Sequence, residues 1–275
     1  MGRITARTPV VRIRLGESTS RRADVLAVEE PLEIRVGGVP LAVTMRTPGH
    51  DVELATGFLL SEGVISSGAD VRGAIHCGGP GTGGADNTYN VLDLTLAPEV
   101  EPPAPNRNFY TTSSCGVCGK ASIEAVQTVS AHPPTGDEVT VAAHVVAGLP
   151  DALRAEQAVF DKTGGLHAAA LCTPAGELLV VREDIGRHNA VDKVVGWAAM
   201  NDRMPASGTM LQVSGRASFE LVQKAVMAGI PILSAVSAPS SLAVELAREM
   251  GLTLAGFVRN GRMNVYSRPE RIQEP

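Results

Sequence analysis

A pair of cysteines separated by two residues is the feature of this sequence best suited to chemistry. Cys115 and Cys118 stand in the segment SSCGVCG, whose small residues are typical of an exposed, mobile loop. Such a pair can carry out dithiol redox chemistry, supply half of a zinc site, or accept and pass on a group as a thiolate. With only four unevenly spaced cysteines, a disulfide-rich secreted fold is excluded, and a reactive role in a reduced compartment is expected.

The surroundings of the pair favour group transfer. A zinc site needs two further ligands, and Cys77 and Cys172 have no Cys or His partner at finger-like spacing except His76 beside Cys77. Thioredoxin-like chemistry would place the pair after an early strand of a βαβ unit, whereas here it follows the proline-rich stretch 97–108. A flexible dithiol suits a carrier that a donor protein and then an acceptor site must reach. Dithiol redox chemistry stays open as an alternative.

Three polar loops form a second candidate site. Each follows a predicted strand and opens a predicted helix, so its free N–H groups and the helix dipole favour an anion. The loops are 183–189 with Arg187 and His188, 214–218 with Gly215 and Arg216, and 237–241. Ordinary N-capping would explain any one of them, but three adjacent loops with two arginines favour a phosphate-bearing ligand.

His188 invites a comparison with zinc deaminases, which use His-x-Glu and Pro-Cys-x-x-Cys at two helix starts. The first position here reads His188-Asn-Ala and the second Ser214-Gly-Arg-Ala-Ser, so the Glu and both Cys are absent. Deamination by that mechanism is excluded and no metal site is expected. His188 is interpreted either as a capping or core-edge histidine or as a ligand contact, and His167 is ambiguous in the same way.

From about residue 155, predicted strands and helices alternate along the chain, and these elements must position the candidate residues. Apolar runs predict strands at 178–181, 209–213, 230–233 and 252–258, with helical periodicity between them. This pattern predicts an α/β domain with a largely parallel sheet, which binds ligands beyond the carboxyl ends of its strands.

The earlier half of the chain reads differently. Alternating residues over 10–46 predict a meander of strands with a turn at Gly37-Gly38, and another strand starts at Asn90. Thr47-Pro48 predicts the start of a helix over 48–62. We therefore expect a strand-rich N-terminal domain with one helix over 1–108, a flexible cysteine loop over 109–120 and the α/β domain over 121–275.

Composition limits the function classes. The 275 residues are 44% hydrophobic and 19% charged, which indicates a chain with a buried core rather than a disordered one. Aromatic residues make up only 3% and the net charge is −5, which argues against a surface that stacks nucleic-acid bases, so nucleic acid is not an expected partner. The first residues, MGRITARTP, contain no apolar run and no stretch is long enough for a membrane span, so neither a leader nor a membrane segment is expected. A cytoplasmic protein with no membrane partner is expected.

Five segments together resemble the formate dehydrogenase accessory sulfurtransferases, the FdhD family. The segments are the cysteine loop at 113–119, FDKTGGLH at 160–167, EDIGRHNAVDK at 183–193, SGR at 214–216 and GFVRNGRMNVY at 256–266. The dithiol alone is weakly specific, but its combination with the segment 183–193 is highly specific.

The resemblance implies a cytoplasmic sulfurtransferase of molybdenum cofactor biosynthesis. A cysteine desulfurase would load sulfur as a persulfide, and the chain would pass it to the bis(molybdopterin guanine dinucleotide) cofactor before that cofactor enters formate dehydrogenase. By motif match, Cys115 is expected to carry the persulfide and Cys118 to relay or release the sulfur.

The resemblance also implies a cytidine-deaminase-like C-terminal fold, a homodimer, and a cofactor site that a guanine nucleotide would mimic. The residues expected at the cofactor site are Phe257, Val258, Arg259, Asn260, Gly261 and Arg262, together with Gly215, Arg216 and His188. A dithiol oxidoreductase and a non-enzymatic cofactor-binding chaperone remain the alternative functions.

Overall fold

The computed structural model describes residues 4–77, 89–101 and 130–274. The cysteine loop predicted at 109–120 lies outside the described residues. The helices are α1 (Asp51–Ser61), α3 (Ala143–Ala155), α4 (Ala158–Thr163), α5 (Arg187–Met200), α6 (Phe219–Met227) and α7 (Ser241–Glu249). The strands are β1 (Thr5–Arg12), β2 (Ser20–Ala27), β3 (Glu30–Val36), β4 (Val39–Arg46), β5 (Val71–Cys77), β6 (Val91–Leu96), β7 (Val141–Ala142), β8 (His167–Cys172), β9 (Leu178–Asp184), β10 (Met210–Val213), β11 (Ile232–Ala235), β12 (Thr253–Arg259), β13 (Arg262–Ser267) and β14 (Ile272–Gln273).

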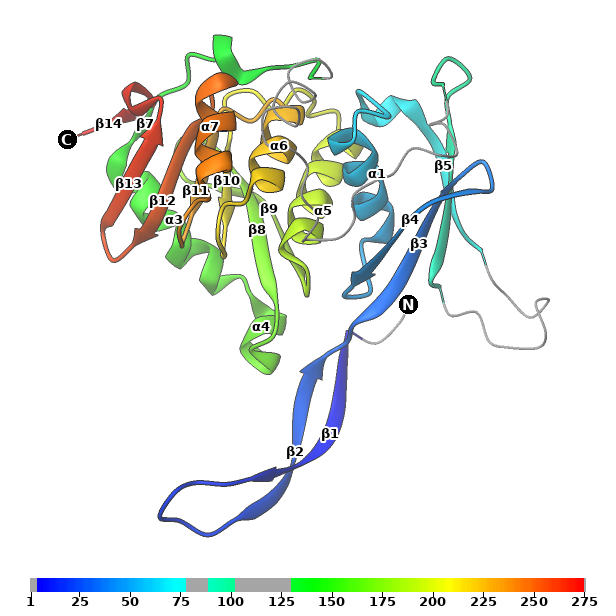
Figure 1. The fold of residues 1–275 in the computed structure, drawn as a ribbon, viewed down its shortest axis with the longest axis vertical. Coiled ribbons are helices and arrows are strands. Elements are labelled where there is room, and N and C mark those ends of the chain that lie inside the picture. The colour runs from blue at the N-terminus through cyan, green and yellow to red at the C-terminus, as the bar shows by residue number, and fades with distance from the viewer. Residues whose placement is uncertain (1–3, 78–88, 102–129, 275) are drawn as a thin grey trace.

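A six-stranded sheet with the order β13-β12-β11-β10-β8-β9 forms the centre of the C-terminal part (Figure 1). An α/β architecture is confirmed, but the prediction of a largely parallel sheet is wrong. Only β10–β11 and β11–β12 are parallel pairs in this sheet, whereas β8–β9, β8–β10 and β12–β13 are antiparallel. The prediction fails because it does not include β8, which is antiparallel to both of its neighbours. The β8 sequence HAAALC is rich in alanine and lacks the β-branched residues by which strands are recognised. The cytidine-deaminase likeness stays a prediction.

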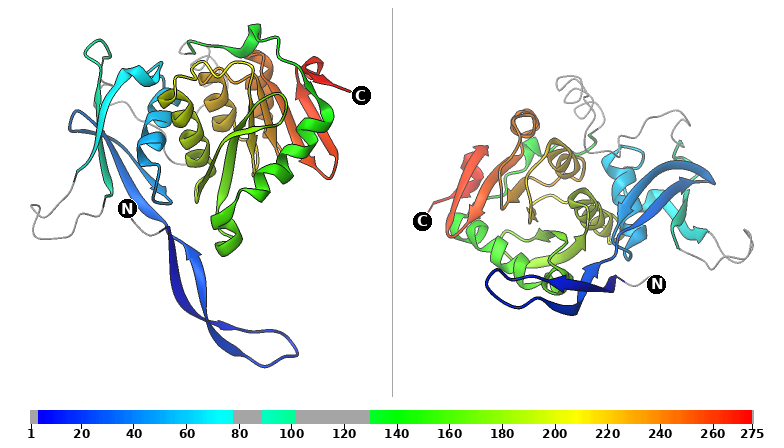
Figure 2. Two further views of the ribbon diagram at one scale, coloured as in Figure 1. Left: turned by 180° about the vertical axis from the view of Figure 1, so that it is seen from behind. Right: turned by 60° about the horizontal axis from the view of Figure 1, so that its bottom comes forward.

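Four strands of this sheet nevertheless share one direction. Strand β8 lies between β9 and β10 and is antiparallel to both, so β9 and β10 point the same way, and β11 and β12 follow β10 in parallel. Their carboxyl ends therefore lie at one edge of the sheet, as expected for the three polar loops. Helix α3 covers one face of the sheet, and α5, α6 and α7 cover the other (Figure 2).

The N-terminal part contains a four-stranded sheet with the order β4-β3-β6-β5 and the projecting ribbon β1–β2. The predicted hairpin at Gly37-Gly38 is confirmed as β3–β4. The rest of the predicted meander is wrong, because β6 enters the sheet beside β3 in parallel. The alternation that predicts these strands buries one face, on which Leu32, Ile34 and Leu92 are fully covered.

Helix α1 begins three residues later than predicted. Its N-cap is His50, which adopts a left-handed conformation with φ 58°, so Pro48 and Gly49 belong to the preceding turn. Thr47 does not cap α1. Its hydroxyl accepts a hydrogen bond from the Ile185 N–H at 3.1 Å, which ties this turn to the end of β9.

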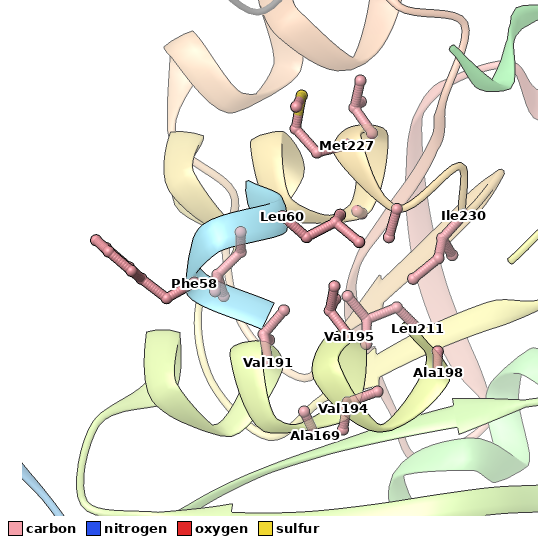
Figure 3. Close-up of a cluster of buried hydrophobic side chains, with 14 of the residues drawn as sticks. Phe58, Leu60, Ala169, Val191, Val194, Val195, Ala198, Leu211, Met227 and Ile230 are labelled. Atoms are coloured by element: carbon pink, nitrogen blue, oxygen red, sulfur yellow. The ribbon is translucent and has the colours of Figure 1, made fainter. Parts of the chain in front are cut away.

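Helices α1 and α5 pack with almost no side chain between their backbones. A methyl group added at Gly57 would lie 1.9 Å from the Asp192 carbonyl oxygen, and one added at Gly196 would lie 1.8 Å from the Glu53 carbonyl oxygen. Around this contact, Phe58 and Leu60 of α1 join the valines of α5 in a shared apolar cluster (Figure 3). The cluster thus includes residues from both sides of the predicted boundary at 108, and the boundary itself stays a prediction.

Candidate functional site

The carboxyl ends of β9 to β12 bring the predicted loops into direct contact. The Ser237 N–H donates to the Gly215 carbonyl at 3.2 Å, and the Phe257 N–H donates to the Ser237 carbonyl at 3.1 Å. Ser214 joins the same edge to β8, because its hydroxyl accepts from the Ala168 N–H at 2.9 Å. The edge is therefore a continuous row of loop backbone that runs from β8 to β12.

Arg187 and His167 flank Gly215 at this edge. A methyl group at Gly215 would lie 3.4 Å from His167 Nδ1 and 4.0 Å from Arg187 Cδ, so both side chains lie beside Gly215 at ordinary van der Waals distance. Burial, and then the Arg187 guanidinium, lower the pKa of His167 below its ordinary value. Arg187 Nε is buried and has no hydrogen-bond partner among the described residues. An orphaned guanidinium nitrogen at the start of α5 fits an anionic ligand.

His188 follows Arg187 in the first turn of α5. Its Nε2 is 3.2 Å from Ser218 Oγ, at the N-cap of α6, and 3.7 Å from Glu220 Oε2. Burial, with Arg187 and Lys224 nearby, lowers the pKa of His188 to about 4. Partial burial would raise the pKa of Glu220, but hydrogen bonds from its own N–H and from Ser218 lower it overall. His188 is thus neutral near pH 7 and faces an ionised carboxylate.

Ser218 and Glu220 are site residues that we did not predict individually. Ser218 falls within the predicted loop, and Glu220 follows in the first turn of α6, where an acidic residue is ordinary. Only the packing of α6 beside α5 reveals that both residues contact His188.

The segment 257–262 forms the tip of the β12–β13 hairpin at the same edge. Arg259 and Arg262 are cross-strand partners and both are exposed, so two like charges stand opposite each other. Such pairing is unfavourable without an anion between or beside the two side chains. Asn260 and Gly261, with φ values of 53° and 72°, form the turn between them.

Two residues of this segment have different surroundings. Phe257 is 36% exposed with a φ of 53°, and its backbone joins the loop edge as described above. Val258 is fully buried in the cluster beneath α3, on the opposite face of the sheet from α5. Its side chain is therefore held in the core, and its predicted part in the cofactor site is limited to its backbone. Arg216 is exposed beside Gly215.

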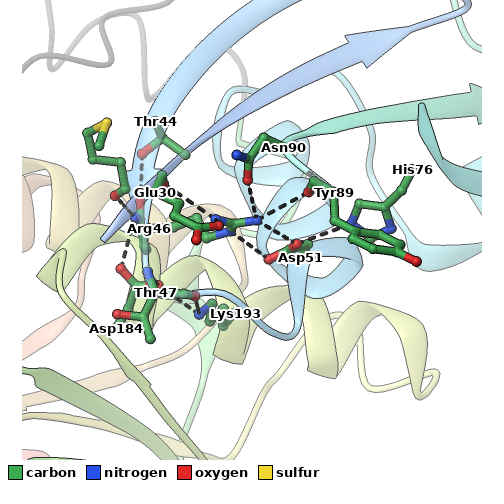
Figure 4. A network of polar contacts seen from close by, with 12 residues as sticks. Glu30, Thr44, Arg46, Thr47, Asp51, His76, Tyr89, Asn90, Asp184 and Lys193 are labelled. Carbon is green, nitrogen blue, oxygen red and sulfur yellow. Dashed lines mark hydrogen bonds and ion pairs between the residues drawn. The ribbon is translucent and has the colours of Figure 1, made fainter. Parts of the chain in front are cut away.

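Most of the described contacts of the segment 183–193 join parts of the fold rather than line the loop edge. The Glu183 carboxylate accepts from the N–H groups of Val159 and Phe160 and so caps α4. Asp184 and Lys193 form a fully buried ion pair at 2.7 Å, and Asp184 also accepts from the Thr47 N–H at 3.1 Å (Figure 4). Within the segment, Arg187 and His188 are the residues placed at the loop edge.

A second buried ion pair lies further along α5. Asp192 pairs with Lys224 of α6 at 2.7 Å and accepts from the Ser61 hydroxyl at 3.2 Å. Burial raises the pKa of Asp192, while Lys224 and Ser61 act in the opposite direction. The pair joins α1, α5 and α6 at one point.

The buried carboxylate of Asp51 centres another network shown in Figure 4. Arg46 binds both oxygens of Asp51 at 3.0 and 3.2 Å, and His76 Nε2 approaches at 3.1 Å. Arg46 also contacts Glu30 and Asn90. These contacts fix the start of α1 to the four-stranded sheet.

The cysteines divide into two groups. Cys115 and Cys118, the predicted reactive pair, lie outside the described residues. Cys172 is buried in β8, and burial raises the pKa of its thiol to about 12, which makes it a poor nucleophile. Cys77 is partly exposed at the end of β5.

Residues 4–77, 89–101 and 130–274 contain neither a metal-binding cluster nor a membrane-spanning helix. No group of three His, Cys, Asp or Glu side chains in these ranges could hold a metal ion. No helix in the same part of the chain is long and apolar enough to cross a bilayer.

Known proteins resemble this chain along nearly its whole length. It is 59% identical to the "Sulfur carrier protein FdhD" of Mycolicibacterium paratuberculosis over 271 residues, which cover 98% of this chain and 99% of that protein. It is also 59% identical to the Streptomyces coelicolor protein of the same name, over 99% of this chain and 97% of the relative.

The fold has a solved counterpart. A crystal structure from Desulfotalea psychrophila, provisionally described as a formate dehydrogenase accessory protein, superposes with a TM-score of 0.79 at 24% identity. The match covers 98% of this chain and 100% of the other. A family model matches residues 27–273, which include both sheets and the loop edge. With this match and the two close relatives, the chain belongs to the FdhD/NarQ family.

Proposed function

We propose that this chain is a cytoplasmic sulfurtransferase that carries persulfide sulfur from a cysteine desulfurase to the bis(molybdopterin guanine dinucleotide) cofactor of formate dehydrogenase. The observation that carries the proposal is the 59% identity, over 98% of this chain, to a protein named a sulfur carrier. The Cys115-x-x-Cys118 spacing supplies the chemistry that such a carrier needs.

Each sulfur step balances with these two thiols. The Cys115 thiolate attacks the terminal sulfur of the desulfurase persulfide, the S–S bond of the donor breaks, and the donor thiolate leaves. In the release step, the Cys118 thiolate attacks the inner sulfur of the Cys115 persulfide and hydrosulfide leaves for the acceptor. The pair becomes a disulfide, because its two electrons reduce the transferred sulfur to sulfide, and a cellular dithiol reductant then restores both thiols.

The loop edge supports binding of the acceptor as substrate. A guanine dinucleotide carries pyrophosphate, and Arg187 offers a buried Nε that has no hydrogen-bond partner in the described part of the chain and lies beside two helix starts. The opposed Arg259 and Arg262 add two exposed guanidinium groups at the same edge. His188, Gly215 and Arg216 complete the proposed cofactor site, and a guanine nucleotide is its proposed mimic.

Mass spectrometry tests the sulfur step. We expect the reduced chain, incubated with a cysteine desulfurase and cysteine, to gain one sulfur atom on Cys115. Cys115→Ser should abolish this gain, because the attacking thiolate is gone. Cys118→Ser should keep the persulfide and release it more slowly, because the resolving thiol is gone.

The control is Cys77→Ser, which removes a partly exposed thiol that has no proposed role and should load sulfur as the wild type does. A wild-type chain without added sulfur would refute the carrier. In that case, a dithiol oxidoreductase would still cycle between thiol and disulfide, and a cofactor-binding chaperone would support formate dehydrogenase even as Cys115→Ser.

Isothermal titration with GDP tests the cofactor site. We expect the double variant Arg259→Ala, Arg262→Ala to bind GDP at least about tenfold more weakly, because charge-assisted hydrogen bonds contribute roughly 1.5–3 kcal/mol each. Arg72→Ala is the matched control, since Arg72 lies on β5 in the other sheet and pairs with Glu99. Equal GDP affinity in the double variant and the wild type would remove the hairpin tip from the site.

A further inference from the structure

The carboxylate of Glu220 has acceptor capacity that the fold does not use. Glu220 lies in the first turn of α6, and its side chain is 47% exposed. It accepts hydrogen bonds from its own N–H and from the Ser218 hydroxyl. Because a carboxylate offers about four acceptor positions, roughly two of them remain open.

The charge of Glu220 is not neutralised by a lysine or arginine of the described residues. Its ion-pair partner there is His188, whose Nε2 lies 3.7 Å from Oε2. Burial lowers the pKa of His188 to about 4, so this imidazole is neutral near pH 7. Partial burial opposes ionisation of Glu220, but the two hydrogen bonds keep its pKa below the ordinary value. The carboxylate is therefore negative and faces a neutral ring.

Ser218 and His188 hold this carboxylate in place. The Ser218 hydroxyl gives its one proton to Glu220, so its oxygen can only accept from His188, whose Nε2 lies 3.2 Å away. The neutral imidazole therefore carries its proton on Nε2. The hydrogen-bond chain runs from His188 through Ser218 to Glu220, and it fixes the carboxylate beside the loop edge.

Arg187 supplies an unpaired group of the opposite sign at the same edge. Its Nε is buried and has no hydrogen-bond partner among the described residues. Its charge lowers the pKa of both His188 and Glu220, so the guanidinium lies near this cluster. Arg187 and Glu220 nevertheless form no ion pair with each other. A site that keeps a cation and an anion apart fits a ligand with an anionic group at one end and hydrogen-bond donors at the other.

Guanine has the donors that such a site requires. Its Watson–Crick edge presents N1–H and the 2-amino group side by side, which match the two oxygens of a carboxylate. Adenine presents a bare N1 at the same position, and two acceptors repel each other. We propose that Glu220 selects guanine at the cofactor site by accepting from N1–H and the 2-amino group, while Ser218 and His188 position its carboxylate. This inference rests on the proposed function, which supplies a guanine dinucleotide as the ligand.

Isothermal titration of the full chain with three nucleotides tests this selection. Inosine diphosphate (IDP) lacks the 2-amino group, and xanthosine diphosphate (XDP) carries a carbonyl in its place. We expect the wild type to bind GDP at least about tenfold more tightly than IDP or XDP, because each loses a hydrogen bond to a charged acceptor. Glu220→Gln should prefer XDP to GDP, because its amide donates to the xanthine carbonyl and accepts from N1–H.

Glu177→Gln is the matched control for this reversal. Glu177 is exposed just before β9, at the opposite end of that strand from the loop edge, so this variant should keep the wild-type order of affinities. Ser218→Ala removes the positioning hydroxyl and should lose most of the preference for GDP over IDP. Ser218→Thr keeps the hydroxyl and should retain this preference. A general loss of structure would weaken both nucleotides alike and leave their ratio unchanged.

Two results would overturn the role of Glu220. One is equal affinity of the wild type for GDP and IDP, and the other is a Glu220→Gln variant that still prefers GDP to XDP. If circular dichroism shows that Glu220→Gln does not fold, an undiminished GDP preference in Ser218→Ala overturns the proposal instead. A wild type that binds none of the three nucleotides would refute the cofactor site itself, whereas equal binding of all three would refute only the selection by Glu220.

Discussion

Gly196→Ala is expected to lower the free energy of unfolding by about 3 kcal/mol, at the upper end of the usual cost of overpacking a core. The new methyl group would lie 1.8 Å from the Glu53 carbonyl oxygen and 2.6 Å from its carbonyl carbon. Both are backbone atoms of α1, so the clash is relieved only if α1 and α5 move apart. That movement would open the apolar cluster shown in Figure 3. Urea unfolding followed by circular dichroism measures the change.

Gly148→Ala is the control for this prediction. Gly148 lies within α3, and nothing is within 4 Å of the position its Cβ would take. Alanine there should raise the free energy of unfolding by up to about 1 kcal/mol, because it has the higher helix propensity. Similar changes in the two variants would show that α1 and α5 are not in close backbone contact.

Asp184→Asn is expected to lower the free energy of unfolding by about 3–5 kcal/mol, the usual cost of removing one partner of a buried ion pair. Asp184 is fully buried and Lys193 is 1% exposed. The asparagine would leave the Lys193 ammonium without a counter-charge. It would also weaken the acceptor for the Thr47 N–H, through which β9 holds the turn before α1. Thermal unfolding and urea unfolding should both show this decrease in the free energy of unfolding.

The exposed ion pair Arg14–Glu17 supplies the control variant for Asp184→Asn. Its side chains are 60% and 59% exposed, and solvent screens such pairs strongly. Glu17→Gln should therefore change the free energy of unfolding by less than about 1 kcal/mol. If Asp184→Asn were as mild as Glu17→Gln, the buried pair would not be the tie between β9 and α1 that Figure 4 shows.

The sequence predicts the strands that bury strongly apolar side chains and the turn at Gly37-Gly38. It does not reveal β8, because the alanines of HAAALC signal neither strand nor helix, and β8 decides the direction of its neighbours. The gathering of the polar loops is nevertheless predicted correctly. It requires only that β9 to β12 share one direction, which they do despite the strand inserted between β9 and β10.

The segment 183–193 shows the limit of reading a site from sequence. Its residue types suit ligand binding, yet Asp184 contacts Thr47 and Asp192 contacts Ser61, both from the N-terminal part of the chain. Such partners are more than 100 positions away, and no local pattern reveals them. Glu220 is missed for the same reason, since its contact with His188 exists only when α6 packs beside α5.

The glycine contact between α1 and α5 also sets an order of events during synthesis. Gly57 leaves the ribosome well before Gly196, and at a synthesis rate of about 5–20 residues per second the interval between them is on the order of ten seconds. During this interval, the face of α1 that carries Phe58 and Leu60 lacks the helix that covers it in the folded chain. The apolar residues of α1 therefore stay uncovered by α5 until that helix has been synthesised, and the close backbone contact forms only then.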